Sequence, residues 1–288
     1  LKRRTMRRWY RGGADQLRPD LKNYPDCLTA PEPGLFNARG LSLRMANKRR
    51  GVLHVINHGG RESVEVFEVL LHGRAPELRW LGCLLMPAGH VGNDVATYSD
   101  GTVLATVLTR PGTTITDFEM GRKTGGVFER APGEAFFKLI PGSELPGNNG
   151  LETARDDSGF YTVAFGLRSV VLFDRGAADG PRAIAKAPGF MPDNVQWDGS
   201  RLIAAGMVAD EPRCGGVRQI IDGVADRMLC HRGYVVAALD PLNLQWTVLA
   251  RGDANAKHNG VSSAVFYRRD LWLGSYQADR LAWRRLRQ

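Results

Sequence analysis

The sequence lacks any apolar run long enough to cross a membrane. None of its hydrophobic stretches approaches the ~20 residues that a transmembrane helix needs, so we expect no helix of this chain to span a bilayer. A secretory signal peptide is not visible either, because no apolar stretch follows the basic residues at the start of the sequence.

Two catalytic motifs and one metal motif are also missing. The chain has no Gly-x-Ser-x-Gly elbow and no phosphate-cradling loop, which argues against serine-hydrolase and nucleotide-dependent chemistry. The four cysteines have no zinc-site spacing. Cys214 and Cys230 flank the insertion "CGGVRQIIDGVADRMLC" and would staple it in an oxidising compartment; buried thiols are the alternative.

Positive charge is abundant but unevenly placed. The net charge is +9, and much of it lies in "LKRRTMRRWYR" at the start and "RLAWRRLRQ" at the end. Basic tails attract nucleic acid or anionic lipid in some proteins. The interior mixes charges of both signs without a basic stripe, so we expect solvated ends and no nucleic-acid partner.

Short strand-like runs dominate the pattern. Segments such as "DGTVLATVL", "SGFYTVAFG" and "DLWLGSY" are separated by Asp-Gly or similar turns, and convincing amphipathic helices are scarce. The 34 glycines and 15 prolines suit a folded, turn-rich chain. An all-β fold is therefore expected.

A sequence motif recurs along the chain: an asparagine followed by a short strand, a turn and a second strand. Its asparagines are Asn37, Asn93, Asn149, Asn194 and Asn259. Antiparallel repeats of about 40–50 residues are typical of propeller blades. We predict one six-bladed β-propeller domain over residues 1–288, with residues 1–35 as a partial first blade or N-terminal segment. A β-sandwich or a two-domain β protein is the alternative.

Radial repetition predicts a metal site. The innermost strands of the blades start at one end of the central channel, so an asparagine at each start would direct amide oxygens to one place. Converging oxygen ligands suit Ca²⁺, and Asp94 and Asp193 would supply negative charge. The alternative is that each asparagine only caps a turn or accepts a bond at a bulge.

The stretch "VLHVINHGGRESVEVFEV" places His58 and two glycines between two strands. One interpretation is a hairpin whose turn needs positive φ, with His58 exposed beside it. The other is that His58 stands at the mouth of a site.

From about Phe36 to its end, the chain resembles the paraoxonase/arylesterase family and, more broadly, the gluconolactonase-type six-bladed propellers. The phrases that carry the resemblance are "LHVINHGGRESVEVFEV", "GNDVATYSDG", "NNGLETARDDSG", "PDNVQWD" and the C-terminal "SSAVFYRRDLWLGSYQADRLAWRRL". Members of that family are mostly secreted, periplasmic or membrane-attached.

The resemblance implies calcium-dependent hydrolysis of lactones and aryl esters, with another divalent cation as an alternative metal. The metal would polarise the carbonyl while a base activates water. The implied ligands are Asn93, Asn149, Asp193 and Asn194, with Asp94 close by. His58 matches the outer histidine of the family's histidine pair.

Two departures from the family pattern bear on catalysis. In "NARGLSL", Arg39 occupies the position of the inner histidine; arginine is a poor base but binds carboxylates and oxyanions. Asp193 then becomes the better candidate base, with His58 orienting or shuttling. The family's acidic pair in the first blade has no counterpart here.

These departures keep two other functions open. A propeller that binds a ligand or partner without catalysis would tolerate Arg39. A ring-forming synthase of the strictosidine type shares the architecture, but no equivalent of its channel glutamate is apparent. The sequence leaves the oligomeric state open.

Overall fold

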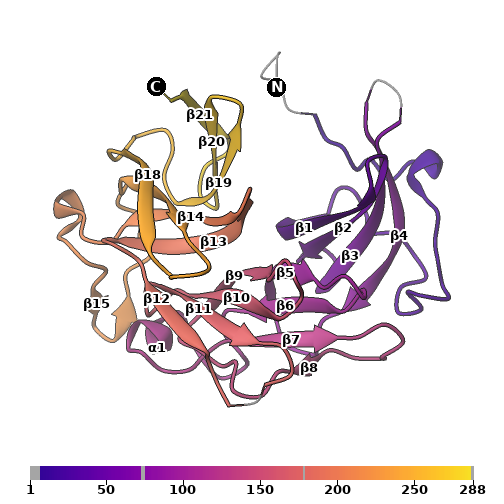
Figure 1. Cartoon of the computed structure of the whole chain (residues 1–288), viewed down its shortest axis with the longest axis horizontal. Coiled ribbons are helices and arrows are strands. Elements are labelled where there is room, and N and C mark those ends of the chain that lie inside the picture. The colour runs from indigo at the N-terminus through magenta and orange to yellow at the C-terminus, as the bar shows by residue number, and fades with distance from the viewer. Residues whose placement is uncertain (1–6, 73–74, 178, 287–288) are drawn as a thin grey trace. The chain divides into compact units, whose positions relative to one another are not determined.

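Strands make up nearly all of the regular secondary structure in the described residues (Figure 1). In the computed structural model the described residues are 7–72, 75–177 and 179–286. The strands are β1 (Ala38–Asn47), β2 (Arg50–Asn57), β3 (Ser63–Leu70), β4 (Glu77–Leu85), β5 (Gly92–Thr97), β6 (Val103–Val107), β7 (Gly126–Arg130), β8 (Lys138–Leu139), β9 (Asn148–Thr153), β10 (Gly159–Ala164), β11 (Ser169–Asp174), β12 (Ala183–Lys186), β13 (Phe190–Asp198), β14 (Arg201–Val208), β15 (Ile220–Ile221), β16 (Val224–Ala225), β17 (Tyr234–Leu239), β18 (Trp246–Gly252), β19 (Val261–Tyr267), β20 (Asp270–Ser275) and β21 (Ala282–Arg285). The helical segments are η1 (Ala14–Gln16), α1 (Ile115–Glu119) and η2 (Pro212–Cys214).

Five antiparallel sheets act as propeller blades. Their strand orders are β1-β2-β3-β4, β5-β6-β7-β8, β9-β10-β11-β12, β13-β14-β17-β18 and β19-β20-β21, and β15 pairs with β16 in a separate hairpin. Each blade connects neighbouring strands in sequence, as propeller blades do. The predicted all-β propeller is confirmed, and five blades are compatible with a six-bladed propeller that has an incomplete blade.

The chain forms two compact units. The first runs to Ala105 and includes Glu129–Lys138; the second comprises Thr106–Phe128 and the chain from Leu139 onward. In the described residues, no helix is both long and apolar enough to cross a membrane.

In the first unit, the N-terminal segment packs on the first sheet. The Tyr10 ring makes edge contacts with Phe36 and Phe67, at 5.4 and 5.3 Å between centroids. A disulfide joins Cys27 to Cys83 of β4. Residues 7–36 thus cover the outer side of a blade instead of contributing a long strand to one.

The first unit also buries a fully bonded carboxylate. Glu65 has no exposed surface. It accepts hydrogen bonds from Arg61 (2.7 and 3.0 Å), from the Ser63 hydroxyl (2.8 Å) and from the Trp80 indole (2.7 Å). A buried charge is tolerated when its partners satisfy it in this way, so Glu65 has a structural part in holding β3 and β4.

The second unit carries the stapled insertion, residues 210–232 between β14 and β17. The structure joins Cys214 to Cys230, with 5.7 Å between their Cα atoms, as the sequence suggested. Between the cysteines the chain forms the β15–β16 hairpin. Arg218 reaches Glu119 of α1 at 2.6 Å, and both side chains are largely buried.

Candidate metal centre

In four blades the innermost strand has a β-bulge near its start, at a comparable position along the strand. In β9, Asn148 pairs with Ala164 and Leu151 with Thr162, so two residues oppose one. Matching register shifts occur in β1, β13 and β19. A bulge redirects side chains and is frequent beside functional sites. Each bulge here therefore presents a short polar segment at the start of its strand.

The bulges define which residues of the blades are equivalent. The equivalent bulge residues are Arg39, Asn149, Asp193 and Ser262; Asn93 is the second residue of β5, as Arg39, Asn149 and Ser262 are of their strands. Asn37 and Asn259 lie outside this register, before β1 and β19. The buried Asn259 holds loops together: its Oδ1 accepts from the backbone of Arg232 at 3.0 Å and its Nδ2 donates to Met228 O at 3.3 Å. The Asn259 side chain therefore has a structural part between two loops.

Three bulges of the second unit lie in direct contact. A Cβ on Gly150 would stand 2.6 Å from both the Cα of Asn194 and the carbonyl oxygen of Asp193, so only glycine fits there. From β13, the Asn194 side chain donates to Ser262 O of β19 at 3.1 Å. The starts of β9, β13 and β19 are thus held together.

Asn149 presents a buried oxygen without a partner. Asn149 is only 6% exposed. Its Oδ1 is fully buried and accepts no hydrogen bond from any described residue. Its backbone oxygen, by contrast, accepts from the Thr106 hydroxyl at 2.6 Å. An unpaired buried acceptor costs ~1–3 kcal/mol, and a cation that it coordinates would remove that cost.

Asp193 supplies a carboxylate in the neighbouring bulge of β13. Asp193 is 8% exposed, and its Oδ1 accepts a hydrogen bond from the side-chain amide of Asn194 at 3.2 Å. Two acceptors, Asp193 Oδ1 and Ser262 O, therefore fix the orientation of the Asn194 amide and leave its Oδ1 for another ligand. Loss of water around its hydroxyl and then the charge of Asp193 raise the pKa of Tyr276 to about 12, although 44% of that residue remains exposed.

This donor set fits a hard cation. Amide and carboxylate oxygens from Asn149, Asp193 and Asn194 match the ligands of Ca²⁺. Across the described ranges, no group of three His, Cys, Asp or Glu side chains gathers in one place. A site rich in imidazole or thiolate, as zinc prefers, is thus not formed by those residues.

Asn93 and Asp94 belong to the first unit, at the start of β5. Gly40 of β1 packs so closely on the backbone of Asp94 that a Cβ would collide with it. Asp94 is buried, and its Oδ1 accepts from the backbone of Val95 at 2.9 Å. Arg39, beside Gly40, takes the bulge position and is exposed. The role of Asn93 and Asp94 in metal binding stays a prediction.

His58 lies in the loop between β2 and β3 and is paired. Its Nδ1 is 2.9 Å from Glu62 Oε2, and its backbone N–H donates to Asn37 O at 3.1 Å. Gly59 meets the backbone of Leu35, where a side chain has no room, and Gly60 has φ +77°. A close backbone contact thus accounts for Gly59, and a positive φ accounts for Gly60. Glu62 orients the imidazole, and sequence analysis missed it although it stands four residues from His58.

Phe190 and Trp197 of β13 have packing roles. Phe190 has no exposed surface and packs edge-on against Trp246 at 5.7 Å. Trp197 donates from its indole to Thr153 O at 2.8 Å between neighbouring blades. Tyr276, by contrast, has a candidate ligand, Asp193, as a charged neighbour.

No family model and no curated protein matches the sequence. Solved structures do resemble the fold. A chain of the nidogen/laminin complex matches with a TM-score of 0.52 and 12% identity, over 88% of this chain and 77% of that one. An auxiliary nutrient binding protein from Bacteroides thetaiotaomicron matches with a TM-score of 0.50 and 11% identity, over 86% and 55% of the two chains.

A luciferin-regenerating enzyme is a further match, with a TM-score of 0.47 and 14% identity over 88% of this chain and 74% of that one. At these identities the likeness shows the propeller fold alone, and one fold hosts many activities.

Proposed function

We propose that this protein is a calcium-binding β-propeller that hydrolyses lactones or aryl esters. The observation that carries the proposal is the buried, unpaired Oδ1 of Asn149 at the point where the bulges of β9 and β13 meet. The resemblance of the ordered sequence phrases to paraoxonases and gluconolactonases supports the choice of reaction.

The residues of the second unit have distinct parts in this proposal. Asn149, Asp193 and Asn194 hold the ion, and Asn93 and Asp94 remain predicted additional ligands. Bound calcium supplies Lewis-acid polarisation of an ester carbonyl. Asp193 is the candidate base that takes a proton from water, because its carboxylate stands among the ligands.

Arg39 and His58 have secondary roles in the proposed reaction. The guanidinium of Arg39 keeps its charge and donates hydrogen bonds, so it would bind a carboxylate or an oxyanion rather than accept a proton. His58, held at Nδ1 by Glu62, keeps Nε2 for orienting the substrate or relaying a proton.

The direct test is hydrolysis of a panel of lactones and phenyl acetate, with and without a calcium chelator. The proposal expects turnover that chelation abolishes and added Ca²⁺ restores. Asp193→Asn should reduce kcat by at least ~100-fold, since it removes the candidate base. Activity indifferent to chelation would contradict the metal mechanism.

A second function is favoured by one observation: Arg39 occupies a bulge position that asparagine takes in β9 and aspartate in β13. A non-catalytic propeller that binds an anionic ligand or a partner would retain such a residue. Calcium binding without turnover on any lactone, ester or phosphotriester would support this function. Gain of esterase activity on Arg39→His would instead show that this position limits catalysis.

A further inference from the structure

The fifth blade has one strand fewer than the other four blades of the described chain. Each of those sheets contains four strands, whereas this sheet has the order β19-β20-β21. Among the described strands, β21 pairs with β20 alone, from Asp270↔Arg285 to Leu273↔Ala282. The position beside β21 is therefore open in the described residues. An exposed strand edge of this kind can pair with another chain.

The register shows which backbone groups of β21 point to this edge. Leu286 N–H donates to Arg269 O at 2.9 Å, so these two opposite residues form a hydrogen-bonded pair. Opposite residues of antiparallel strands alternate between hydrogen-bonded and non-hydrogen-bonded pairs. The backbone groups of Arg284 therefore face β20, and the N–H and C=O of Arg285 point away from β20, toward the open edge.

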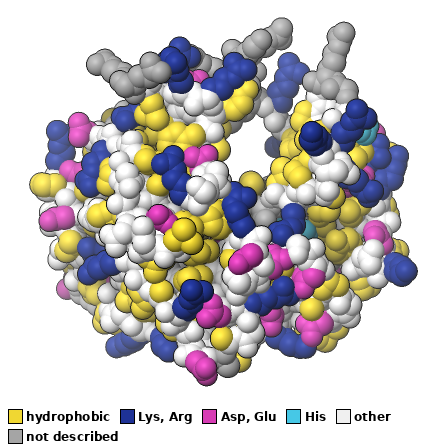
Figure 2. Space-filling view, in the orientation of Figure 1, with side chains coloured by type: hydrophobic (Ala, Val, Ile, Leu, Met, Phe, Trp, Pro, Cys, Tyr) yellow, Lys and Arg dark blue, Asp and Glu magenta, His cyan; other side chains and the backbone are white. Residues whose placement is uncertain are grey.

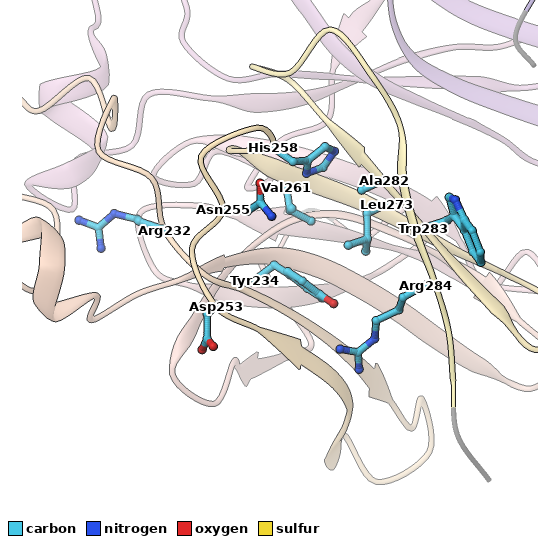
Figure 3. A pocket seen from close by; sticks show the side chains of 10 residues that line it. All are labelled: Arg232, Tyr234, Asp253, Asn255, His258, Val261, Leu273, Ala282, Trp283 and Arg284. Atoms are coloured by element: carbon cyan, nitrogen blue, oxygen red, sulfur yellow. The ribbon is translucent and has the colours of Figure 1, made fainter. Parts of the chain in front are cut away.

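Side-chain contacts on both faces of the sheet hold β21 in place. Arg284 Nη1 donates to Arg251 O of β18 at 2.9 Å, and its guanidinium lies over the Tyr234 ring at 5.9 Å. Figure 3 shows the Arg284 side chain extending from β21 toward Tyr234. On the opposite face, Trp283 packs beside Trp272, with 6.1 Å between ring centroids. The edge strand is thus positioned before any partner binds.

Positive charge surrounds the open edge. Residues 255–286 contain six Lys and Arg residues but two Asp residues, and each aspartate already pairs with an arginine. Arg268, Arg269 and Arg284 are exposed and form no ion pair within the described part of the chain. Figure 2 shows Lys and Arg side chains on the part of the surface where Figure 1 places β20 and β21. This charge attracts an acidic partner.

The side chains of β21 indicate the sequence of a strand that would fit beside it. Trp283 continues a cross-strand row with Trp272 and the 52% exposed Val265, so an apolar residue suits the position opposite it. Acidic residues suit the positions opposite Arg284 and Arg285. A second copy of β21 fits less well, because it would bring the arginines of two copies together.

We propose that the open edge of β21 binds an extended acidic segment of a partner protein as a fourth strand. The backbone of the segment pairs with Arg285, and its Asp or Glu side chains face Arg269, Arg284 and Arg285. Strand addition takes affinity from main-chain hydrogen bonds and specificity from alternate side chains. None of the proposed metal ligands belongs to this edge, so binding should not require calcium.

The test is an NMR titration of the full chain with the acetylated, amidated peptide Thr-Glu-Glu-Val-Thr-Val. Saturable binding with a Kd of about 0.1–1 mM at low salt is expected, and it should weaken as the salt concentration rises. The matched peptide with Lys in place of both Glu residues should bind at least ~10-fold more weakly. Hydrogen exchange of the Arg285 amide should slow on binding, because the new strand protects it.

Arg285→Pro, compared with Arg285→Ala, isolates the backbone contact. Both variants lose the same charge, but proline also removes an N–H that β20 does not use, and edge positions tolerate this. Arg285→Pro should bind the acidic peptide at least ~10-fold more weakly than Arg285→Ala. Should Arg285→Pro fail to fold, two peptides N-methylated at odd or at even amides give the same test on the wild-type chain, and one of them should lose binding.

Four results would overturn the proposal. They are no saturation by the acidic peptide below about 10 mM, equal binding of the Lys peptide, equal binding by Arg285→Pro and Arg285→Ala, and full binding of both N-methylated peptides. A wild-type dimer in light scattering that Arg285→Pro abolishes would also overturn it, because a second copy would then occupy the edge.

Discussion

The side-chain amide of Asn194 donates a hydrogen bond to the backbone oxygen of Ser262 at 3.1 Å. This bond ties the bulge of β13 to the bulge of β19, two segments 68 residues apart. The same amide also donates to Asp193 at 3.2 Å. One side chain therefore positions a candidate ligand and joins two blades.

Asn194→Leu should lower the free energy of unfolding by about 1–3 kcal/mol, because it leaves the Ser262 carbonyl without this donor. Urea denaturation measures the loss. Asn194→Asp is the matched variant: it also loses the donor and adds repulsion against Asp193, but it keeps ligand oxygens. Calcium should restore more stability to Asn194→Asp than to Asn194→Leu. Equal responses of the two variants would show that Asn194 is structural only.

Gly150 tests the contact between β9 and β13. Gly150→Ala would press a Cβ to within 2.6 Å of Asn194 and Asp193, so the strands must separate. We expect a loss of about 1–3 kcal/mol in unfolding free energy together with weaker calcium binding by calorimetry. Gly34→Ala is the control, since its Cβ would meet nothing closer than a Glu32 oxygen at 3.6 Å. Similar behaviour of both variants would argue against a tight contact at Gly150.

The fold was predictable because each blade repeats the same local signals. Alternating apolar residues and Asp-Gly or similar turns mark antiparallel strands wherever they occur. The same repetition did not show which positions of the inner strands are equivalent. Asn37 and Asn259 resemble the other asparagines in sequence, but bulges move the equivalent positions to Arg39 and Ser262. A bulge adds one residue without a sequence signal, so this shift could not be found from the pattern.

Contacts between residues far apart in the sequence could not be predicted either. The proximity of Gly150 to Asn194 depends on how β9 and β13 pack, which no local pattern encodes. The disulfide Cys214–Cys230 was visible because only 16 positions separate its cysteines. Cys27 and Cys83, 56 positions apart, gave no such signal.

His54 should make stability depend on pH. It is buried in β2, and burial lowers its pKa from 6.5 to about 4. The unfolded chain binds this proton at higher pH than the folded chain does. Stability is therefore fully present above about pH 6.5 and falls as the pH drops toward 4, by about 3 kcal/mol.

His54→Leu removes this proton linkage and should flatten the denaturation midpoint between pH 7 and pH 4, measured in urea. Mutation of the exposed His72 to leucine is the control and should retain the wild-type slope. An unchanged slope in His54→Leu would mean that other groups cause the acid sensitivity.

The disulfide of the stapled insertion should contribute measurably to stability. Closing a loop of this length restricts the unfolded chain by about 3 kcal/mol. The double variant Cys214→Ser/Cys230→Ser should therefore lose about that free energy in thermal unfolding. The stapled insertion should also become the first site of limited proteolysis. Loss of stability without new cleavage there would contradict a local role.

The measurement closest to the central claim is the calcium-induced rise in melting temperature of the wild-type protein and of Asn149→Leu. At a Ca²⁺ concentration 100 times Kd, wild type should gain about 2.7 kcal/mol, or several degrees. Asn149→Leu should match or exceed wild-type stability in chelator, because its lost oxygen had no partner, and should gain nothing from calcium. A calcium response that survives Asn149→Leu, or no response in wild type, would contradict the account.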